Sequence, residues 1–521
     1  MSLPFGKISN LQPSALWILA LLSACAFVMG GTTLGASASA APSSKKTLRV
    51  LINGNGLPVY SDESSVQGLE TVLAAVLGQL VYASDKFDLQ PGLLSSFRWD
   101  FEKKLYMLEL RDGVTFHNGR LATSQDLEFS LLRGLLSKKG TWFKSFFANV
   151  EGIQKIEGKT KYKTGMVPGI RVIDSRRVTI KLKAPNPSFL HALARSYFSL
   201  VPQEALKADY LTWKTYPIGA GPYKITSSAE GGSKVILKKV DRSGAGPDEI
   251  VISSKGEALK QELVIGAPAD EAAFRLEPSP TANSVTGIYF NYENELGRDI
   301  AFRKAIALSI GRAPLVVNVS SYSANPEFLA SQFWGRINAK EHQDLAGAQK
   351  ELTKVKSKIH SDVIRIPVFN SEFGNGNFGK YVLALQGQLR ELGLKIEFYK
   401  SEKKFFDKTD SKIPFRIISL GADVADPLVL FGLFRKGSPM VPHFPVNDEG
   451  FERLYKKAAN AEALDAKVIA VRELSSYFQN EVYAVPLFER HGVVAISRTR
   501  VRDMGAQHGS LAIYLDRVVM Q

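Results

Sequence analysis

The stretch LELRDGVTFHNGRLATSQDLEFSLLR, residues 108–133, predicts more about the fold than any other part of the sequence. It contains, in order, signals for a strand (Leu108 to Leu110), a turn (Arg111, Asp112 and Gly113), a second short strand (Val114, Phe116 and His117), a turn (Asn118 and Gly119) and a helix. Thr123 followed by Asp126 nearly matches a capping box, and the apolar residues after it supply a buried helix face. The stretch therefore predicts two short strands and a capped helix.

The order of these pieces resembles the signature of the bacterial extracellular solute-binding proteins of family 5, the oligopeptide-, dipeptide- and nickel-binding components of ABC importers. Members of that family carry a stretch of the form LRxGVxFHDGxPxTAxDVxFSxxR. This chain departs from it at Asn118, where Asp is usual. Later segments such as YPIGAGPYKI (216–225) follow the family order, and the resemblance covers most of residues 47–505 with its main gap at 241–280.

The resemblance implies an α/β protein with the two-lobed periplasmic-binding-protein (Venus flytrap) fold and an extra subdomain in the first lobe. More than one hydrophobic core is also expected from the length of 521 residues. The implied division of the chain is a signal peptide (1–40, or 1–24 in a lipoprotein), lobe I (47–90, 205–286 and 492–521), the extra subdomain of lobe I (91–204) and lobe II (287–491).

The N-terminal segment predicts export. Residues 1–40 contain no acidic residue, one basic residue and an apolar run over 15–29, which is typical of a secretory signal. Two cleavage patterns stay open: Ala38-Ser39-Ala40 suits ordinary signal peptidase, whereas Leu22-Ser23-Ala24-Cys25 suits a lipobox with lipidation of Cys25. Because Cys25 is the only cysteine, we expect no disulfide in the folded protein. The expected location is the periplasm, with a membrane anchor if Cys25 is lipidated.

The positive charge does not indicate nucleic-acid binding. The formal net charge is +15, but Lys and Arg are spread along the chain in runs no longer than pairs such as Lys103-Lys104. There is also no RNA-binding signature, so we interpret the charge as a solvated surface and expect no nucleic-acid partner.

Residues 363–399 imitate a nucleotide-binding unit. A strand, the glycine pattern GNGNFG (374–379), a helix and Glu397 occur in that order. We interpret the segment as a βαβ unit of the second lobe whose glycine-rich loop lines the ligand cleft, because the chain is exported and the glycines do not directly follow the strand. In dipeptide-binding relatives this loop supplies an Arg for the ligand carboxylate, whereas here it offers Asn370, Ser371, Glu372 and Asn375.

Asp423 is the strongest candidate for ligand binding. The stretch GADVADPLVLFGLF (421–434) resembles a family segment whose first Asp pairs with the α-ammonium of a bound peptide, and that Asp corresponds to Asp423. Asp426 and Pro427 correspond to the structural Asp-Pro pair of the same segment. A carboxylate in a closed cleft favours cationic ligands strongly. The alternative is that Asp423 only caps a turn.

Nothing in the sequence predicts catalysis. It contains no GxSxG, HExxH or CxxC, and its seven histidines lack metal-ligand spacing, so we expect no enzyme, cofactor or metal site. The predicted function is the substrate-binding component of an ABC importer, a monomer that captures oligopeptides or dipeptides and delivers them to an inner-membrane permease. A nonpeptide cargo such as a metal chelate or sugar, and a nontransporting sensory or surface lipoprotein, stay open as alternatives.

Overall fold

The computed structural model describes residues 46–52, 67–83, 89–100, 102–137, 147–156, 161–183, 186, 189–229, 232–240, 246–266, 269–279, 282, 284–317, 319, 321–369, 378–401, 412–422, 426–436, 438, 447–507 and 512–521. All of them belong to one compact unit, Lys45–Gln521. No helix in these ranges is both long enough and apolar enough to cross a membrane.

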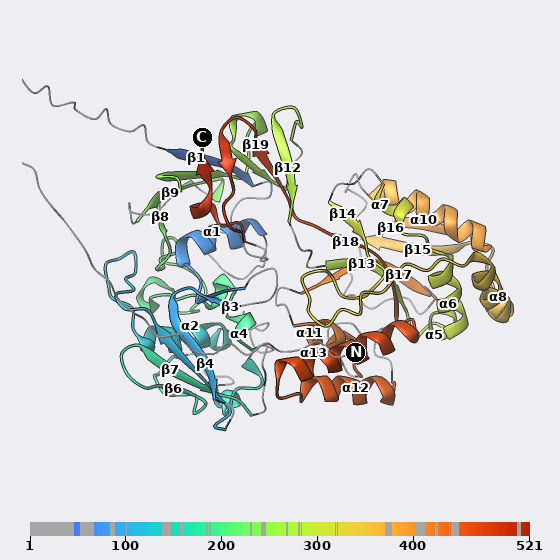
Figure 1. Cartoon of the computed structure of the whole chain (residues 1–521), viewed down its shortest axis with the longest axis horizontal. Helices are drawn as coiled ribbons and strands as arrows, with labels where there is room; N and C mark the ends of the chain where they lie inside the picture. The colour runs from blue at the N-terminus through green and yellow to red at the C-terminus, as the bar shows by residue number, and fades with distance from the viewer. Residues whose placement is uncertain are drawn as a thin grey trace, which may run out of the picture. The chain divides into compact units, whose positions relative to one another are not determined.

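Lobe I is built on a seven-stranded sheet with the order β12-β19-β11-β1-β10-β9-β8 (Figure 1). Its strands are β1 (Thr47–Ile52), β8 (Tyr223–Ser228), β9 (Lys234–Lys239), β10 (Glu249–Ser253), β11 (Leu263–Ile265), β12 (Phe274–Pro278) and β19 (Val493–Ser497). The central strand β1 pairs in parallel with β10 and β11, and the other pairs are antiparallel. Leu48 and Val50 of β1 are fully buried, as expected of a central strand. Helix α1 (Gln67–Leu77) contacts β8.

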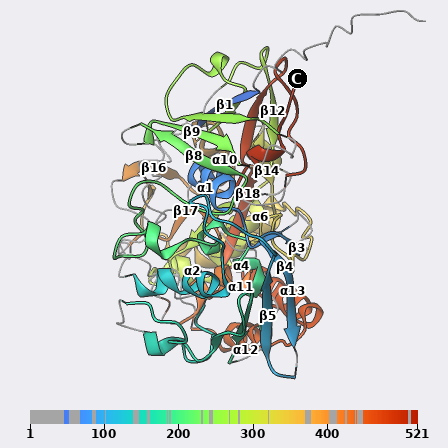
Figure 2. The ribbon, with the colours of Figure 1, turned by 90° about the vertical axis from the view of Figure 1, so that its left-hand side faces the viewer.

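A second sheet extends lobe I. Its order is β4-β5-β7-β6, and Figure 2 shows β4 and β5 below the seven-stranded sheet. The elements are β4 (Leu94–Asp100), β5 (Leu105–Leu110), β6 (Ile170–Val172), β7 (Arg177–Lys181) and helix α2 (Ser124–Leu136). Leu48 of the first sheet, Leu108 of the second and Leu127 of α2 all belong to one hydrophobic core. The second sheet is therefore an extra part of lobe I, as the sequence predicted.

Lobe II is organised around the antiparallel sheet β14-β18-β13-β17. Its strands are β13 (Ser284–Phe290), β14 (Tyr322–Ala324), β17 (Phe415–Gly421) and β18 (Ala484–Arg490). Side chains of β13 alternate between two cores: Ile288 and Phe290 lie in one, Val285 and Tyr289 in the other. This strand is therefore buried on both faces.

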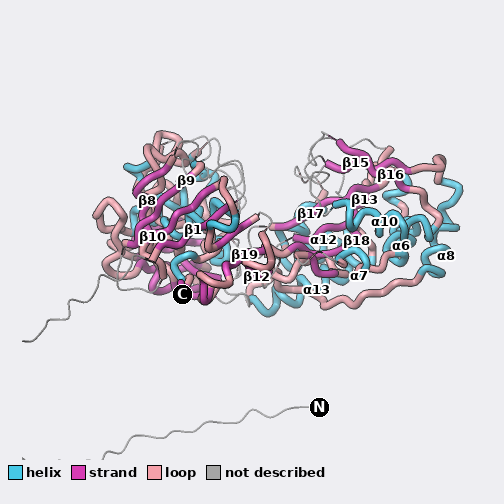
Figure 3. The backbone as a smooth tube through the Cα atoms, turned by 90° about the horizontal axis from the view of Figure 1, so that it is seen from above, coloured by secondary structure: helices cyan, strands magenta, loops and turns pink. Residues whose placement is uncertain are grey.

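Helices cover both faces of this sheet. The first core contains side chains of α6 (Ile300–Ser309), α8 (Leu345–Val355) and α10 (Phe378–Leu392), three helices that lie together in Figure 3. The second core contains side chains of α11 (Leu428–Phe431), α12 (Glu449–Ala459) and α13 (Leu464–Asn480). Beside α10, strands β15 (Ile364–Phe369) and β16 (Ile396–Ser401) pair in parallel, which confirms the predicted βαβ unit.

The remaining helices and strands are short. They are β2 (Val81–Ala83), β3 (Leu89–Pro91), α4 (Phe189–Ala192), α5 (Glu295–Arg298), α7 (Ala313–Val316), β20 (Val501–Asp503) and β21 (Val519–Met520). β2 pairs with β3, and β20 pairs with β21.

Residues 108–133 form the predicted strand at their start and the predicted helix at their end, but the strand predicted between them does not form. The Asp126 carboxylate accepts the backbone N–H of Thr123 (2.8 Å), so the cap forms as expected. The predicted strand over 114–117 is wrong, because only one isolated bridge, Thr115 to Leu121, forms there. The reason is that His117 bonds to a distant segment: its N–H donates to the Gly219 carbonyl (2.9 Å), and its Nε2 lies 2.9 Å from the Gly221 carbonyl.

Gly219 and Gly221 are needed because the backbone packs closely at both positions. A Cβ on Gly219 would lie 2.4 Å from the Cα of Leu77, and one on Gly221 would lie 2.6 Å from the carbonyl oxygen of Ala75. Both glycines therefore let the backbone before β8 press against α1. Helix α1 ends at Leu77, where the following Gly78 has a φ of +73°.

Candidate functional site

The predicted ligand-binding residues lie outside the described residues. They are Asn370, Ser371, Glu372, Asn375 and Asp423, and Cys25 is also outside. The strands that precede them are described: β15 ends at Phe369, and β17 ends at Gly421. Because β15 and β17 contact each other, the two predicted ligand segments start from neighbouring strands of lobe II.

The segment that holds Asp423 is fixed on both sides. On one side, Gln332 Nε2 donates to the carbonyl of Ala422 (2.9 Å). On the other side, Asp426 Oδ1 accepts the N–H of Leu428 (3.0 Å) at the start of α11. The predicted structural role of the Asp-Pro pair is thereby confirmed for Asp426, which caps this short helix.

The second carboxylate oxygen of Asp426 faces a buried lysine. Its Oδ2 lies 3.4 Å from Nζ of Lys467 on α13. Lys467 is only 2% exposed, and the same Nζ donates to Oδ1 of Asn186 at 3.0 Å and lies 5.8 Å from the centre of the Trp334 ring. Asn186 follows β7 and belongs to lobe I, so this lysine contacts both lobes.

Sequence reasoning missed Lys467 and Asn186. One local signal was present, because Lys467 lies in phase with the buried Val471, Leu474 and Phe478 of α13. A lysine on an apolar helix face needs a polar partner. The identity of that partner could not be predicted from a residue 281 positions away.

Two short crossings connect the lobes, at 279–283 between β12 and β13 and at 491–492 between β18 and β19. They are bonded to each other, because Ser279 N–H donates to the carbonyl of Gly492 (2.6 Å) and His491 Nδ1 lies 2.9 Å from the carbonyl of Ser279. His491 Nε2 also lies 3.4 Å from Glu489 Oε1. The hydrogen bond to Glu489 raises the pKa of His491, although partial burial opposes it.

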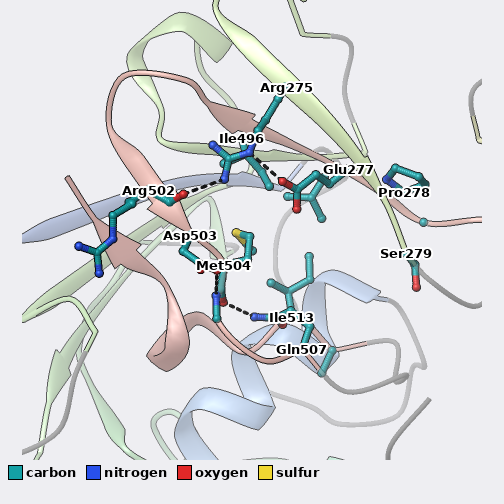
Figure 4. Close-up of a pocket in the computed structure, with 14 residues that line it drawn as sticks. Arg275, Glu277, Pro278, Ser279, Ile496, Arg502, Asp503, Met504, Gln507 and Ile513 are labelled. Carbon is teal, nitrogen blue, oxygen red and sulfur yellow. Dashed lines mark hydrogen bonds and ion pairs between the residues drawn. The ribbon is translucent and has the colours of Figure 1, made fainter. Parts of the chain in front are cut away.

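A cavity of about 500 Å³ lies beside these crossings in lobe I (Figure 4). Its polar groups already bind one another: Arg275 Nε donates to Glu277 Oε1 (2.7 Å), and Gln507 Nε2 donates to the carbonyl of Met504 (2.7 Å). The lining residues include Pro278, Ser279, Gly492, Val494, Ile496 and Ile513. The cavity lining thus mixes polar and apolar side chains, and the polar groups named above already have partners within the protein.

His117 has a structural role in lobe I. Besides its bond to Gly221, burial lowers its pKa, so the neutral ring is favoured. Among the described residues, no three His, Cys, Asp or Glu side chains gather in a way that could hold a metal ion.

Comparison with known proteins identifies the family. The model of the bacterial extracellular solute-binding proteins, family 5 (middle), matches residues 88–441, which is more than half of the chain. The oligopeptide-binding protein OppA of Bacillus subtilis is 22% identical, with 90% of this chain and 91% of that protein covered.

Solved structures show the same fold. A putative peptide-binding protein AppA from Clostridium difficile superposes with a TM-score of 0.75 at 16% identity, covering 91% of this chain and 100% of that one. OppA of Haemophilus influenzae, solved in complex with the peptide RPPGFSPFR, gives a TM-score of 0.69 at 15% identity and covers 92% of this chain and 99% of that one. The two-lobed architecture of periplasmic peptide-binding proteins is therefore shared.

Proposed function

Because the chain belongs to the bacterial extracellular solute-binding proteins of family 5, we propose that it captures peptides for an ABC importer and delivers them to an inner-membrane permease. The observation that carries this proposal is the architecture: separate hydrophobic cores in the two lobes, joined by two short crossings. Such lobes can rotate about the crossings, and a ligand that contacts both lobes stabilises the closed arrangement. A permease can then distinguish the loaded form from the empty one.

The proposed ligand-recognition group is the Asp423 carboxylate, which would accept hydrogen bonds from the α-ammonium of a peptide. Asn370, Ser371, Glu372 and Asn375 would line the same cleft. These four residues supply no cation, so we propose that the ligand carboxylate is not paired by this loop. These groups favour recognition of the free N-terminus of a peptide over its free C-terminus.

A substitution tests the role of Asp423. We expect Asp423→Ala to weaken binding of a free tripeptide at least about tenfold, or about 1.4 kcal/mol, in isothermal titration calorimetry. Binding of the N-acetylated tripeptide, which lacks the ammonium, should change little. Asp465→Ala, at an exposed carboxylate of α13, is the matched control. Equal losses for the two peptides would overturn the assignment.

The cargo class is tested by native mass spectrometry of the exported protein purified without refolding. A set of peptide masses that leave on denaturation supports peptide uptake. A single nonpeptide mass would replace the peptide by another solute, and an empty protein encoded without a neighbouring permease would favour the sensory alternative.

Five further properties belong to the same proposal. We propose a monomer in the periplasm with no nucleic-acid partner, no cofactor and no catalytic activity. Mass spectrometry of the mature N-terminus decides between release after Ala40 and lipidation of Cys25.

We also propose the division into lobe I (47–90, 205–286 and 492–521), its extra subdomain (91–204) and lobe II (287–491). The memberships of the two main sheets support it, because strands of lobe I come from three separate parts of the chain, although β13 of the lobe II sheet already begins at Ser284. Limited proteolysis at the crossings is the test, with fragments expected to separate near residues 280 and 491.

A further inference from the structure

Lys467 joins the two lobes through its side chain. It lies on α13 of lobe II, yet its Nζ donates to Oδ1 of Asn186 in lobe I at 3.0 Å. The two residues are 281 positions apart. This bond is separate from the covalent crossings at 279–283 and 491–492, so it can break when the lobes rotate.

Lobe II fixes the position of Lys467. The α13 face that carries it packs against the segment around Trp334, because Ser475 Oγ donates to the carbonyl of Gly335 (3.3 Å) and a Cβ on Gly335 would lie 2.5 Å from Val471. Trp334 lies beside the ammonium at cation–π distance, 5.8 Å. Residues of lobe II therefore hold the Lys467 side chain in one position.

Lobe I fixes the position of Asn186 equally well. Its carbonyl accepts the hydroxyl proton of Tyr106 at 2.7 Å, and Tyr106 is only 2% exposed. The Tyr106 ring stacks on Phe189 with ring centres 5.5 Å apart and lies 4.6 Å from Trp99. The backbone of Asn186 is thus attached to the core of the extra sheet.

The same ammonium also contacts lobe II itself. The Asp426 carboxylate, which accepts the N–H of Leu428 at the start of α11, lies 3.4 Å from Lys467 Nζ. Asp426, Lys467 and Asn186 thus form one chain of contacts from lobe II to lobe I.

We propose that Lys467 is a positioning residue that stabilises the closed lobes by contacting Asp426 of lobe II and Asn186 of lobe I at the same time. The ammonium loses water when lobe I covers it, and the Asn186 amide and the Asp426 carboxylate replace that water. In the open arrangement Asn186 moves away and water returns to Nζ. The inference rests on the proposed function, since it assigns the regulation of the same ligand site.

The first test measures lobe separation without added peptide. Cys25→Ser removes the single cysteine, and Lys238→Cys in β9 and Lys350→Cys in α8 place spin labels at exposed positions of the two lobes. The protein is freed of ligand by unfolding and refolding, and double electron–electron resonance then gives the distance distribution. We expect Asn186→Ala and Lys467→Met each to lower the ratio of short to long distances at least about threefold.

Two further variants control this test. Lys467→Arg keeps a cationic donor and should restore most of the short-distance population. Lys457→Met removes an exposed lysine of α12 whose Nζ lies 2.6 Å from Glu473 of α13. It should leave the distance distribution unchanged. Distributions of Asn186→Ala and Lys467→Met that match the parent protein would overturn the proposal. Asn186→Ala keeps the test valid even if Lys467→Met does not fold.

The second measurement separates this inference from the proposed function. With a tripeptide that binds the parent protein, Asn186→Ala should raise Kd at least about threefold, mainly through faster dissociation. If the parent binds no peptide but the distance shift occurs, the bridge between the lobes is supported and the peptide assignment fails. If peptides bind and neither variant changes distances or dissociation, the peptide assignment is supported and the role of Lys467 fails.

Discussion

Helices α2 and α13 both carry charge on a buried face, but the partners of that charge lie in different places. In α2, Glu128 and Arg133 are fully buried, and both bind groups of lobe I. In α13, Lys467 is almost as buried, yet it contacts Asp426 in lobe II and Asn186 in lobe I. A buried charge whose partners share its core keeps those partners when the lobes rotate, whereas one whose partner lies in the other lobe responds to lobe movement.

The contacts of α2 illustrate the first case. Glu128 accepts the hydroxyl proton of Tyr162 (2.8 Å) and the N–H of Gly165 (2.9 Å). Arg133 Nη2 donates to the carbonyl of Tyr197 (2.8 Å). The groups joined by these bonds all lie in lobe I, so rotation of the lobes leaves these bonds unchanged.

The largest expected effect is that of Arg133→Met. The substitution keeps much of the side-chain volume but removes donors from the carbonyls of Tyr197 and Tyr210, and we expect a loss of about 3 kcal/mol in the free energy of unfolding. Lys467→Met should cost about 1 kcal/mol or less, because water can reach Asp426 when the lobes part. Urea unfolding measures both. Equal costs for the two variants would remove the distinction between the helices.

A matched control is available for that comparison. Lys181→Met removes an exposed lysine of lobe I whose Nζ lies 2.9 Å from Glu151, and exposed pairs contribute little. We expect no measurable change in its urea midpoint.

A smaller effect is expected for Glu128→Gln and appears in the pH dependence. Burial raises the pKa of Glu128, although its bonds to Gly165 and Tyr162 oppose this. The folded protein therefore binds more protons than the unfolded chain just above pH 4.5, and this carboxyl makes stability fall as the pH rises to the raised pKa. Glu128→Gln should remove that part of the fall. Urea unfolding between pH 4 and 8 measures the difference, and identical slopes would contradict it.

The same contrast shows how far the sequence could predict the fold. The end of β5 at Leu110, the cap at Thr123 and the start of α2 were predictable because turn glycines, capping pairs and helical periodicity all operate within a few residues. The βαβ unit of β15, α10 and β16 was predictable for the same reason. The predicted strand over 114–117 failed because His117 bonds to residues about a hundred positions later.

The candidate site also has a part that could be predicted from the sequence and a part that could not. The chemistry of Asp423 and of Asn370 to Asn375 came from the family resemblance, and their geometry remains a prediction because they lie outside the described residues. The cap formed by Asp426 was predictable from the adjacent Pro427 and the following apolar run. Its contact with Lys467, and that of Lys467 with Asn186, depend on how separately folded segments meet. Local sequence patterns contain no information about such meetings.

The smallest expected effect is that of His491, whose charge lies at a crossing between the lobes. It lies at the crossing between β18 and β19, with its ring bonded to Ser279 of the other crossing and close to Glu489 on its own strand. Arg336, which helps to lower the pKa of Glu489, is the other charge acting on this pair. Because this contact bonds the two crossings to each other, we expect His491 to affect stability without affecting lobe separation.

The pH range of this effect follows from the direction of the shift. The hydrogen bond to Glu489 raises the pKa of folded His491, so its stabilising contribution is complete below the ordinary value of 6.5 and is lost as the pH rises through the raised pKa. We therefore expect His491→Gln to lower the urea midpoint at pH 6 but hardly at pH 9, whereas His342→Gln, at an exposed histidine, changes neither. Spin-label distances should be the same in both variants. A change in lobe separation with His491→Gln would mean that the crossings themselves, and not only Lys467, set the open and closed populations.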